Sequence, residues 1–115
     1  MQQNIGASEL LEKVANENLY QNLIIQLNKD FQLSNLNESF ELSSEPNQLK
    51  KALANILLKL ITKQYDDYLN LLYRIDVSEK ELLTVSSNNL NVTVEQITYI
   101  ILKREYQKVW FKNRF

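Results

Sequence analysis

Few side chains in this sequence could carry out acid-base or nucleophilic chemistry. The chain contains neither histidine nor cysteine, so it lacks the commonest general base, the commonest metal ligand and any thiol nucleophile. Asp66 and Asp67 are the closest approach to a pair of catalytic carboxylates. Neighbouring residues of a helix point about 100° apart, so these two side chains cannot flank one substrate bond. With Lys63 just before them, they are better explained as surface ion pairs.

No other pattern points to an active site. The only glycine is Gly6, which excludes a glycine-rich phosphate loop. Tyr65, Tyr68 and Tyr73 are expected to pack through their rings and leave their hydroxyl groups in water. The acidic residues show no metal-ligand spacing. We therefore expect a protein that is not an enzyme and that binds no cofactor or metal.

The stretch LLYRIDVSEKEL (71–82) places Arg74 and Asp76 in an apolar context. Ser78, followed three residues later by Glu81, matches the capping box that begins a helix. This pattern predicts a corner between two helices, with Arg74 and Asp76 as a candidate ion pair within it. Whether that pair binds anything stays open at this stage.

Composition indicates that helices position these residues. The 115 residues include one glycine and one proline, too few for the tight turns of a β-sandwich or barrel. The chain is 44% hydrophobic and 23% charged, as in an average globular protein. We predict one all-α domain over residues 1–115, a bundle of four to five helices. With no apolar run long enough for a bilayer and no signal-peptide pattern, a cytoplasmic protein without a transmembrane segment is expected.

The clearest helical pattern extends over residues 46–75 and predicts one long central helix. Pro46 suits the first turn of a helix, where its missing amide proton is not needed. Apolar residues follow one side and polar residues the other, with a kink near Gln64 left open. The polar stripe consists of Asn55, Lys59, Lys63, Asp66, Asn70 and Arg74.

Shorter elements flank this helix. An N-terminal helix is expected to begin with Ser8 as its cap and to be interrupted at residues 16–18. Residues 31–45 are predicted to form a connecting loop. A short helix is expected over residues 79–87, and the last helix is expected to begin with Thr93 as its cap.

The last helix differs from the others in charge and in its apolar pattern. Residues 103–115, the basic and aromatic helix end, contain five basic residues and one acidic residue, whereas residues 1–102 contain 8 basic and 13 acidic ones. Apolar residues fall on two sides of this helix, which one buried stripe does not explain. Either the helix is enclosed within the bundle, or one side contacts a second molecule.

Two functions follow from this segment as hypotheses. The first is a non-enzymatic protein-protein interaction or assembly module that self-associates, as a homodimer, through the C-terminal helix. The second is a nucleic-acid-binding accessory protein that uses the basic and aromatic C-terminal segment. A helix-turn-helix and a membrane-surface helix are weaker alternatives. The candidate partner-binding residues are Tyr99, Leu102, Tyr106, Lys108, Val109, Trp110 and Lys112.

One resemblance accompanies these patterns. The segment LLYRIDVSE (71–79), followed by a helix with an ExxK-type basic stretch from Glu105 to Lys108, resembles small helical bacterial proteins for which no activity is established. The resemblance covers the second half of the chain. It implies a bacterial helical protein but carries over no site residues.

Overall fold

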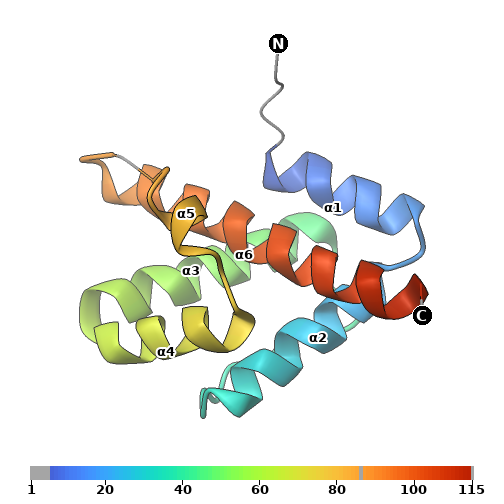
Figure 1. The fold of residues 1–115 in the computed structure, drawn as a ribbon, viewed down its shortest axis with the longest axis horizontal. Coiled ribbons are helices and arrows are strands. Elements are labelled where there is room, and N and C mark those ends of the chain that lie inside the picture. The colour runs from blue at the N-terminus through green and yellow to red at the C-terminus, as the bar shows by residue number, and fades with distance from the viewer. Residues whose placement is uncertain (1–5, 86, 115) are drawn as a thin grey trace.

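Six helices make up the computed structural model, which describes residues 6–85 and 87–114 (Figure 1). They are α1 (Ala7–Asn16), α2 (Tyr20–Leu33), α3 (Pro46–Lys63), α4 (Tyr65–Ile75), α5 (Glu79–Leu82) and α6 (Leu90–Arg114). The described residues contain no strand. The all-α prediction is therefore confirmed, with one helix more than expected. Among the described helices, none has both the length and the apolar character needed to cross a membrane.

The centre of the bundle is α6, not the segment 46–75. With 25 residues, α6 is the longest helix, and it packs against each of the other five. In Figure 1 it crosses the middle of the molecule, with α1 above it, α2 below it and α3 behind it. The long central helix of the bundle is thus the last helix of the chain.

A break at Gln64 divides the predicted long helix into α3 and α4. The backbone angles of Gln64 are φ −141° and ψ 58°. Its amide donates to the Leu60 carbonyl (2.9 Å), while its own carbonyl accepts from the Tyr68 amide (3.1 Å), so one residue ends α3 and begins α4. An unbroken helix over 46–75 would be about 45 Å long, longer than the 39 Å of the whole molecule. The break allows both segments to pack their apolar sides against α6.

The side-chain pattern predicted for residues 46–75 survives the break. All six residues of the predicted polar stripe are exposed. Leu53 and Leu57 of α3 are fully buried, as are Leu71 and Ile75 of α4. The helical period thus gave the correct inward and outward sides on both helices.

Three corners of the bundle use asparagine or aspartate in the left-handed conformation. Asn18 (φ 59°), Asn35 (φ 61°) and Asp76 (φ 70°) follow the ends of α1, α2 and α4. These residue types tolerate positive φ better than others do. The predicted interruption at residues 16–18 is confirmed. A chain with a single glycine thus makes its sharp turns with short polar side chains.

Two of the predicted helix starts are only partly correct. Gly6, not Ser8, is the cap residue of α1, which begins one residue before Ser8. Ser78 is the cap of α5, as predicted, but its hydroxyl oxygen accepts from the Lys80 amide (3.2 Å) instead of the Glu81 amide. α5 is also shorter than the predicted helix over 79–87.

The last helix begins earlier than predicted. Thr93 lies inside α6, whose first residue is Leu90. The side chain of Asn89 takes the capping role, because its Oδ1 accepts from the amides of Asn91 (2.9 Å) and Val92 (3.3 Å). Asparagine is as good a cap as the predicted threonine.

The predicted loop over 31–45 is largely confirmed, although α2 continues to Leu33. Phe40 of this loop is buried and packs edge-on against Phe31, with ring centroids 5.1 Å apart. Asn28 of α2 holds the same residue by two hydrogen bonds: its Nδ2 donates to the Phe40 carbonyl (2.8 Å) and its Oδ1 accepts from the Phe40 amide (2.7 Å). The loop is therefore fixed against α2.

Candidate functional site

The predicted partner-binding side of the last helix lies mostly inside the bundle. Leu102 is 0% exposed and Val109 is also buried, while Tyr99 and Tyr106 are half-buried. Because α6 contacts all five other helices, both of its apolar sides face this chain. Enclosure within the bundle therefore accounts for most of this helix, whereas Trp110 and Phe111 near its end remain exposed. Leu102 and Val109 are core residues, and assigning them to a partner surface was wrong.

Of the residues predicted to form the basic and aromatic helix end, two large apolar side chains are exposed in the structure. Trp110 is 39% exposed and Phe111 is 61% exposed. Their rings meet edge-on with centroids 6.3 Å apart, and the Arg114 guanidinium lies 4.8 Å from the centre of the Trp110 ring. We call Trp110 and Phe111 the C-terminal aromatic tip. Arg114 covers part of it.

The basic side chains of α6 mostly contact acidic groups of the same chain. The ion pairs are Lys103 with Glu81 (3.2 Å), Arg104 with Asp76 (3.1 Å) and Lys108 with Asp30 (2.5 Å). Lys112 donates to the side-chain oxygen of Gln26 (2.7 Å), a neutral partner. The charges predicted to face a partner are thus largely compensated within the bundle.

An open groove of about 850 Å³ passes along the exposed side of this helix end. Tyr106 forms part of its α1 side, where its hydroxyl donates to Glu17 Oε1 (2.8 Å) and its ring lies 5.5 Å from Lys13 Nζ. Burial, reinforced by the Glu17 carboxylate, raises the pKa of Tyr106 to about 12. The lining residues are Lys13, Glu17, Gln26, Arg104, Tyr106, Gln107, Lys108, Trp110, Phe111 and Lys112.

The candidate corner pair of Arg74 and Asp76 does not form. Asp76 instead pairs with Arg104 of α6, whose Nη2 donates to Asp76 Oδ2 (3.1 Å) and whose Nε donates to the Asp76 carbonyl (3.0 Å). The left-handed turn at Asp76 directs this residue toward α6, whereas Arg74 belongs to the exposed polar stripe of α4. The corner therefore joins α4 to α6.

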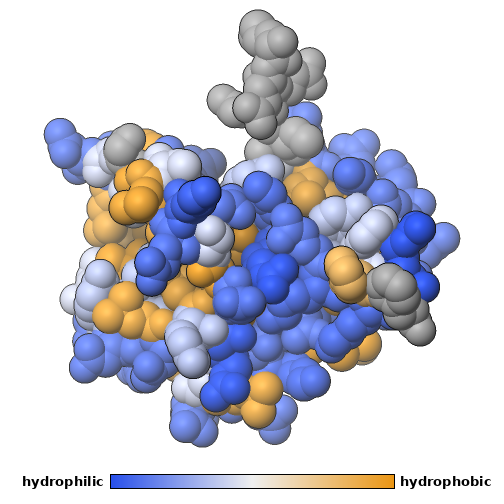
Figure 2. Space-filling model, in the orientation of Figure 1, coloured by the Kyte–Doolittle hydropathy of each residue, from blue (hydrophilic) through white to orange (hydrophobic). Residues whose placement is uncertain are grey.

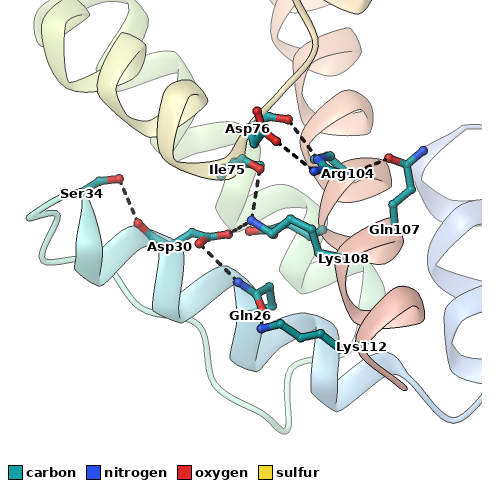
Figure 3. A network of polar contacts seen from close by, with 10 residues as sticks. Gln26, Asp30, Ser34, Ile75, Asp76, Arg104, Gln107, Lys108 and Lys112 are labelled. Carbon is teal, nitrogen blue, oxygen red and sulfur yellow. Dashed lines mark hydrogen bonds and ion pairs between the residues drawn. The ribbon is translucent and has the colours of Figure 1, made fainter. Parts of the chain in front are cut away.

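A cluster of charged and polar side chains lies between α2 and α6 (Figure 3). It consists of Gln26, Asp30, Glu105 and Lys108, which we call the buried polar cluster. Lys108 Nζ lies 2.5 Å from Asp30 Oδ2 and 3.1 Å from Glu105 Oε1, and it also donates to the Ile75 carbonyl (3.1 Å). Gln26 Nε2 donates to Asp30 Oδ1 (3.3 Å). One lysine thus faces two carboxyl groups.

The protonation of Glu105 follows from this arrangement. Glu105 is 0% exposed; the 3.1 Å ion-pair contact of its Oε1 with Lys108 lacks hydrogen-bond geometry, and its Oε2 has no hydrogen-bond partner among the described residues. Burial, and then the nearby Asp30 carboxylate, raise the pKa of Glu105 to about 9, although Lys108 opposes the shift. Glu105 is therefore neutral at pH 7. The ion pair of Lys108 with Asp30 then leaves the cluster with no net charge.

The chemistry open to this cluster is limited by its burial. A catalytic group must contact its substrate, and Glu105 has no exposed surface. In the part of the chain that the structure describes, no three acidic side chains come together as metal ligands. The cluster is better suited to fixing the contact between α2 and α6, because the ion pair of Lys108 with Asp30 joins these two helices in one register.

Sequence reasoning missed the acidic members of this cluster. Asp30 lies three residues after Leu27, and Glu105 lies midway between Ile101 and Val109, four residues from each. Both acids thus fall on apolar helix sides that prove to be buried. An acidic residue on an apolar stripe was the available signal.

A second missed feature is an exposed apolar stripe on α4. Tyr65, Leu69 and Tyr73 are spaced four residues apart and are 55%, 45% and 84% exposed. We call them the α4 stripe. Tyr68, in contrast, is buried against the core. The spacing of Tyr65, Leu69 and Tyr73, next to the predicted polar stripe, was visible in the sequence.

Comparison with known proteins found no relative of this chain. No protein-family model matches the chain, and neither the curated proteins nor the solved structures include a match.

Proposed function

We propose that this chain is a non-enzymatic protein-interaction module. One observation carries the proposal: large apolar side chains remain exposed on α4 and at the end of α5, although the bundle has a well-packed core. They are Tyr65, Leu69, Tyr73 and Leu83, the last of which is 82% exposed; together we call them the α4–α5 surface. Figure 2 shows apolar side chains gathered on the side where α4 and α5 lie, whereas the area over the C-terminal half of α6 is mostly hydrophilic, with an apolar side chain near the end of the chain. Apolar surface of this kind marks contact sites more often than isolated exposed residues do.

The proposed contact surface differs from the one that the sequence suggested. The aromatic tip at Trp110 remains available as a second, smaller contact. The larger exposed apolar surface, however, lies on α4 and α5. Tyrosine is enriched at protein interfaces, because its ring supplies contact area and its hydroxyl group tolerates water.

The nucleic-acid alternative has less support than the protein-interaction hypothesis. Lys103, Arg104 and Lys108 already contact acidic groups of the same chain. A phosphate backbone would have to compete with those carboxylates for the same cations. Nothing comparable opposes a protein partner on the α4–α5 surface.

Photo-crosslinking in native cells tests the proposal. A photoreactive amino acid replaces Tyr73 or Leu83 in turn, and replaces the exposed Lys51 of α3 as a matched control. We expect protein adducts of defined mass from Tyr73 and Leu83 and none from Lys51. The absence of adducts above the control level at both positions would overturn the proposal. A third position, Trp110, tests the aromatic tip in the same way.

A further inference from the structure

The exposed side of α4 carries two parallel rows of side chains. One row is the α4 stripe, in which Leu69 lies midway between Tyr65 and Tyr73. The other row is Asp66, Asn70 and Arg74, with the same spacing of four residues and all exposed. Residues four apart lie one above another on a helix. The two rows therefore form an apolar strip beside a polar strip.

Charge divides the polar row into two ends. Asp66 lies in the first turn of α4 and Arg74 in its last turn. Among the described residues, neither side chain has an ion-pair or hydrogen-bond partner. Asn70, which is uncharged, lies midway between them. The row thus has a negative end, a neutral middle and a positive end.

Both rows become self-complementary when two copies of α4 pack antiparallel about a two-fold axis. Such an axis, passing beside Leu69 and Asn70, places apolar row against apolar row and polar row against polar row. Tyr65 then meets Tyr73 of the second copy, and Asp66 meets Arg74 of the second copy, twice by symmetry. A parallel pair, with its two-fold axis along the helices, would instead place the apolar row of one copy against the polar row of the other.

We propose that α4 is a homodimer face on which two copies of this chain pack α4 against α4, antiparallel about Leu69 and Asn70. This inference rests on the proposed function and names the partner for part of the same surface. A second copy is favoured over an unrelated protein because the apolar pattern and the charge pattern match the same symmetry operation. The aromatic tip shows no such match, since Arg114 covers part of Trp110.

Disulfide trapping tests the geometry directly. The chain has no cysteine, so Asn70→Cys introduces a single thiol close to its own symmetry copy. Under mild oxidation we expect Asn70→Cys to form a covalent dimer, at least tenfold faster than Lys51→Cys at the exposed control position of α3. Circular dichroism confirms that both variants are folded. Equal rates for the two variants would overturn the proposal.

Charge exchange tests which residues face each other. By sedimentation equilibrium at low salt, Asp66→Arg and Arg74→Asp are each expected to weaken dimerisation about tenfold or more, because each places like charges across the axis. The double variant exchanges both charges and should restore dimerisation, a rescue that general destabilisation of the fold would not produce. A wild-type chain that stays monomeric at every concentration tested would overturn the homodimer. Adducts of Tyr73 with a different protein would still support the proposed function, so the two failures are distinguishable.

Discussion

At the scale of single residues, Glu105 is the most unusual side chain of the structure. It is a carboxyl group without exposed surface, beside a second carboxylate and one lysine. The structure retains it in the neutral form, since a second buried negative charge would cost several kcal/mol. In the unfolded chain the carboxyl group is in water, so its ionisation has no such cost. Glu105 therefore links the stability of the fold to pH.

The sign of this linkage is determined by the raised pKa. Glu105 has a pKa near 9 in the fold, against 4.5 as its ordinary value. Below about pH 4.5 both states carry the proton, and the full stability is present. As the pH rises toward 9 the unfolded chain loses the proton while the native state keeps it, so the free energy of unfolding falls.

Glu105→Gln is expected to remove this pH dependence, because the amide stays neutral at every pH. At pH 8 the variant should exceed the wild type in free energy of unfolding by on the order of 5 kcal/mol, and near pH 4.5 the two should be similar. Urea titrations between pH 4.5 and 8 measure the difference. Glu95→Gln, an exposed position on the same helix, is the control. A loss of stability that is equal at all pH values would mean instead that Glu105 is ionised and paired with Lys108.

At the scale of elements, the sequence predicted which side of a helix faces the core, but not where every helix begins and ends. The inward and outward sides of α3 and α4 depend only on the helical period and could be predicted. A kink near Gln64 was left open by the sequence, but whether the helix breaks there could not be predicted, because neither glycine nor proline marks the position. The break depends on the size of the bundle and on the position of α6, which are properties of the folded chain.

The same distinction applies to the candidate site. An apolar face can be recognised in the sequence, but the partner that covers it cannot. Leu102 and Val109 were correctly identified as apolar and wrongly assigned to the surface, because the packing of five helices around α6 is a long-range property. Asp30 and Glu105 lie 75 positions apart in the sequence, so their proximity becomes visible only in the fold.

The loop between α2 and α3 supplies a prediction at this scale. Asn28→Ala removes both hydrogen bonds to the Phe40 backbone and should lower the free energy of unfolding by about 1–3 kcal/mol. It should also speed hydrogen exchange of the Phe40 amide. Asn37→Ala, at an exposed position of the same loop, is the control and should change stability by less than about 0.5 kcal/mol. Equal effects of the two substitutions would show that packing of Phe40, not the asparagine, fixes the loop.

At the scale of the whole molecule, charge is arranged so that the basic end of the chain is neutralised by the rest. Residues 103–115 are basic and the remainder of the chain is acidic, for a formal net charge of −1. The ion pairs of α6 reach Glu81, Asp76 and Asp30, which belong to three other parts of the chain. The positive charge of α6 therefore contributes to assembling the bundle more than to an external field.

This arrangement predicts weak interaction with nucleic acid. The wild-type chain should cause no retardation of DNA or RNA in gels at low salt, since its paired cations are not free to bind phosphate. Freeing two of them by Glu81→Gln together with Asp76→Asn should increase binding, because Lys103 and Arg104 lose their carboxylate partners. Wild-type retardation that weakens on Lys108→Ala or Lys112→Ala would contradict the prediction and would favour the nucleic-acid alternative. Binding that is unchanged in the double variant would show that internal pairing is not what limits it.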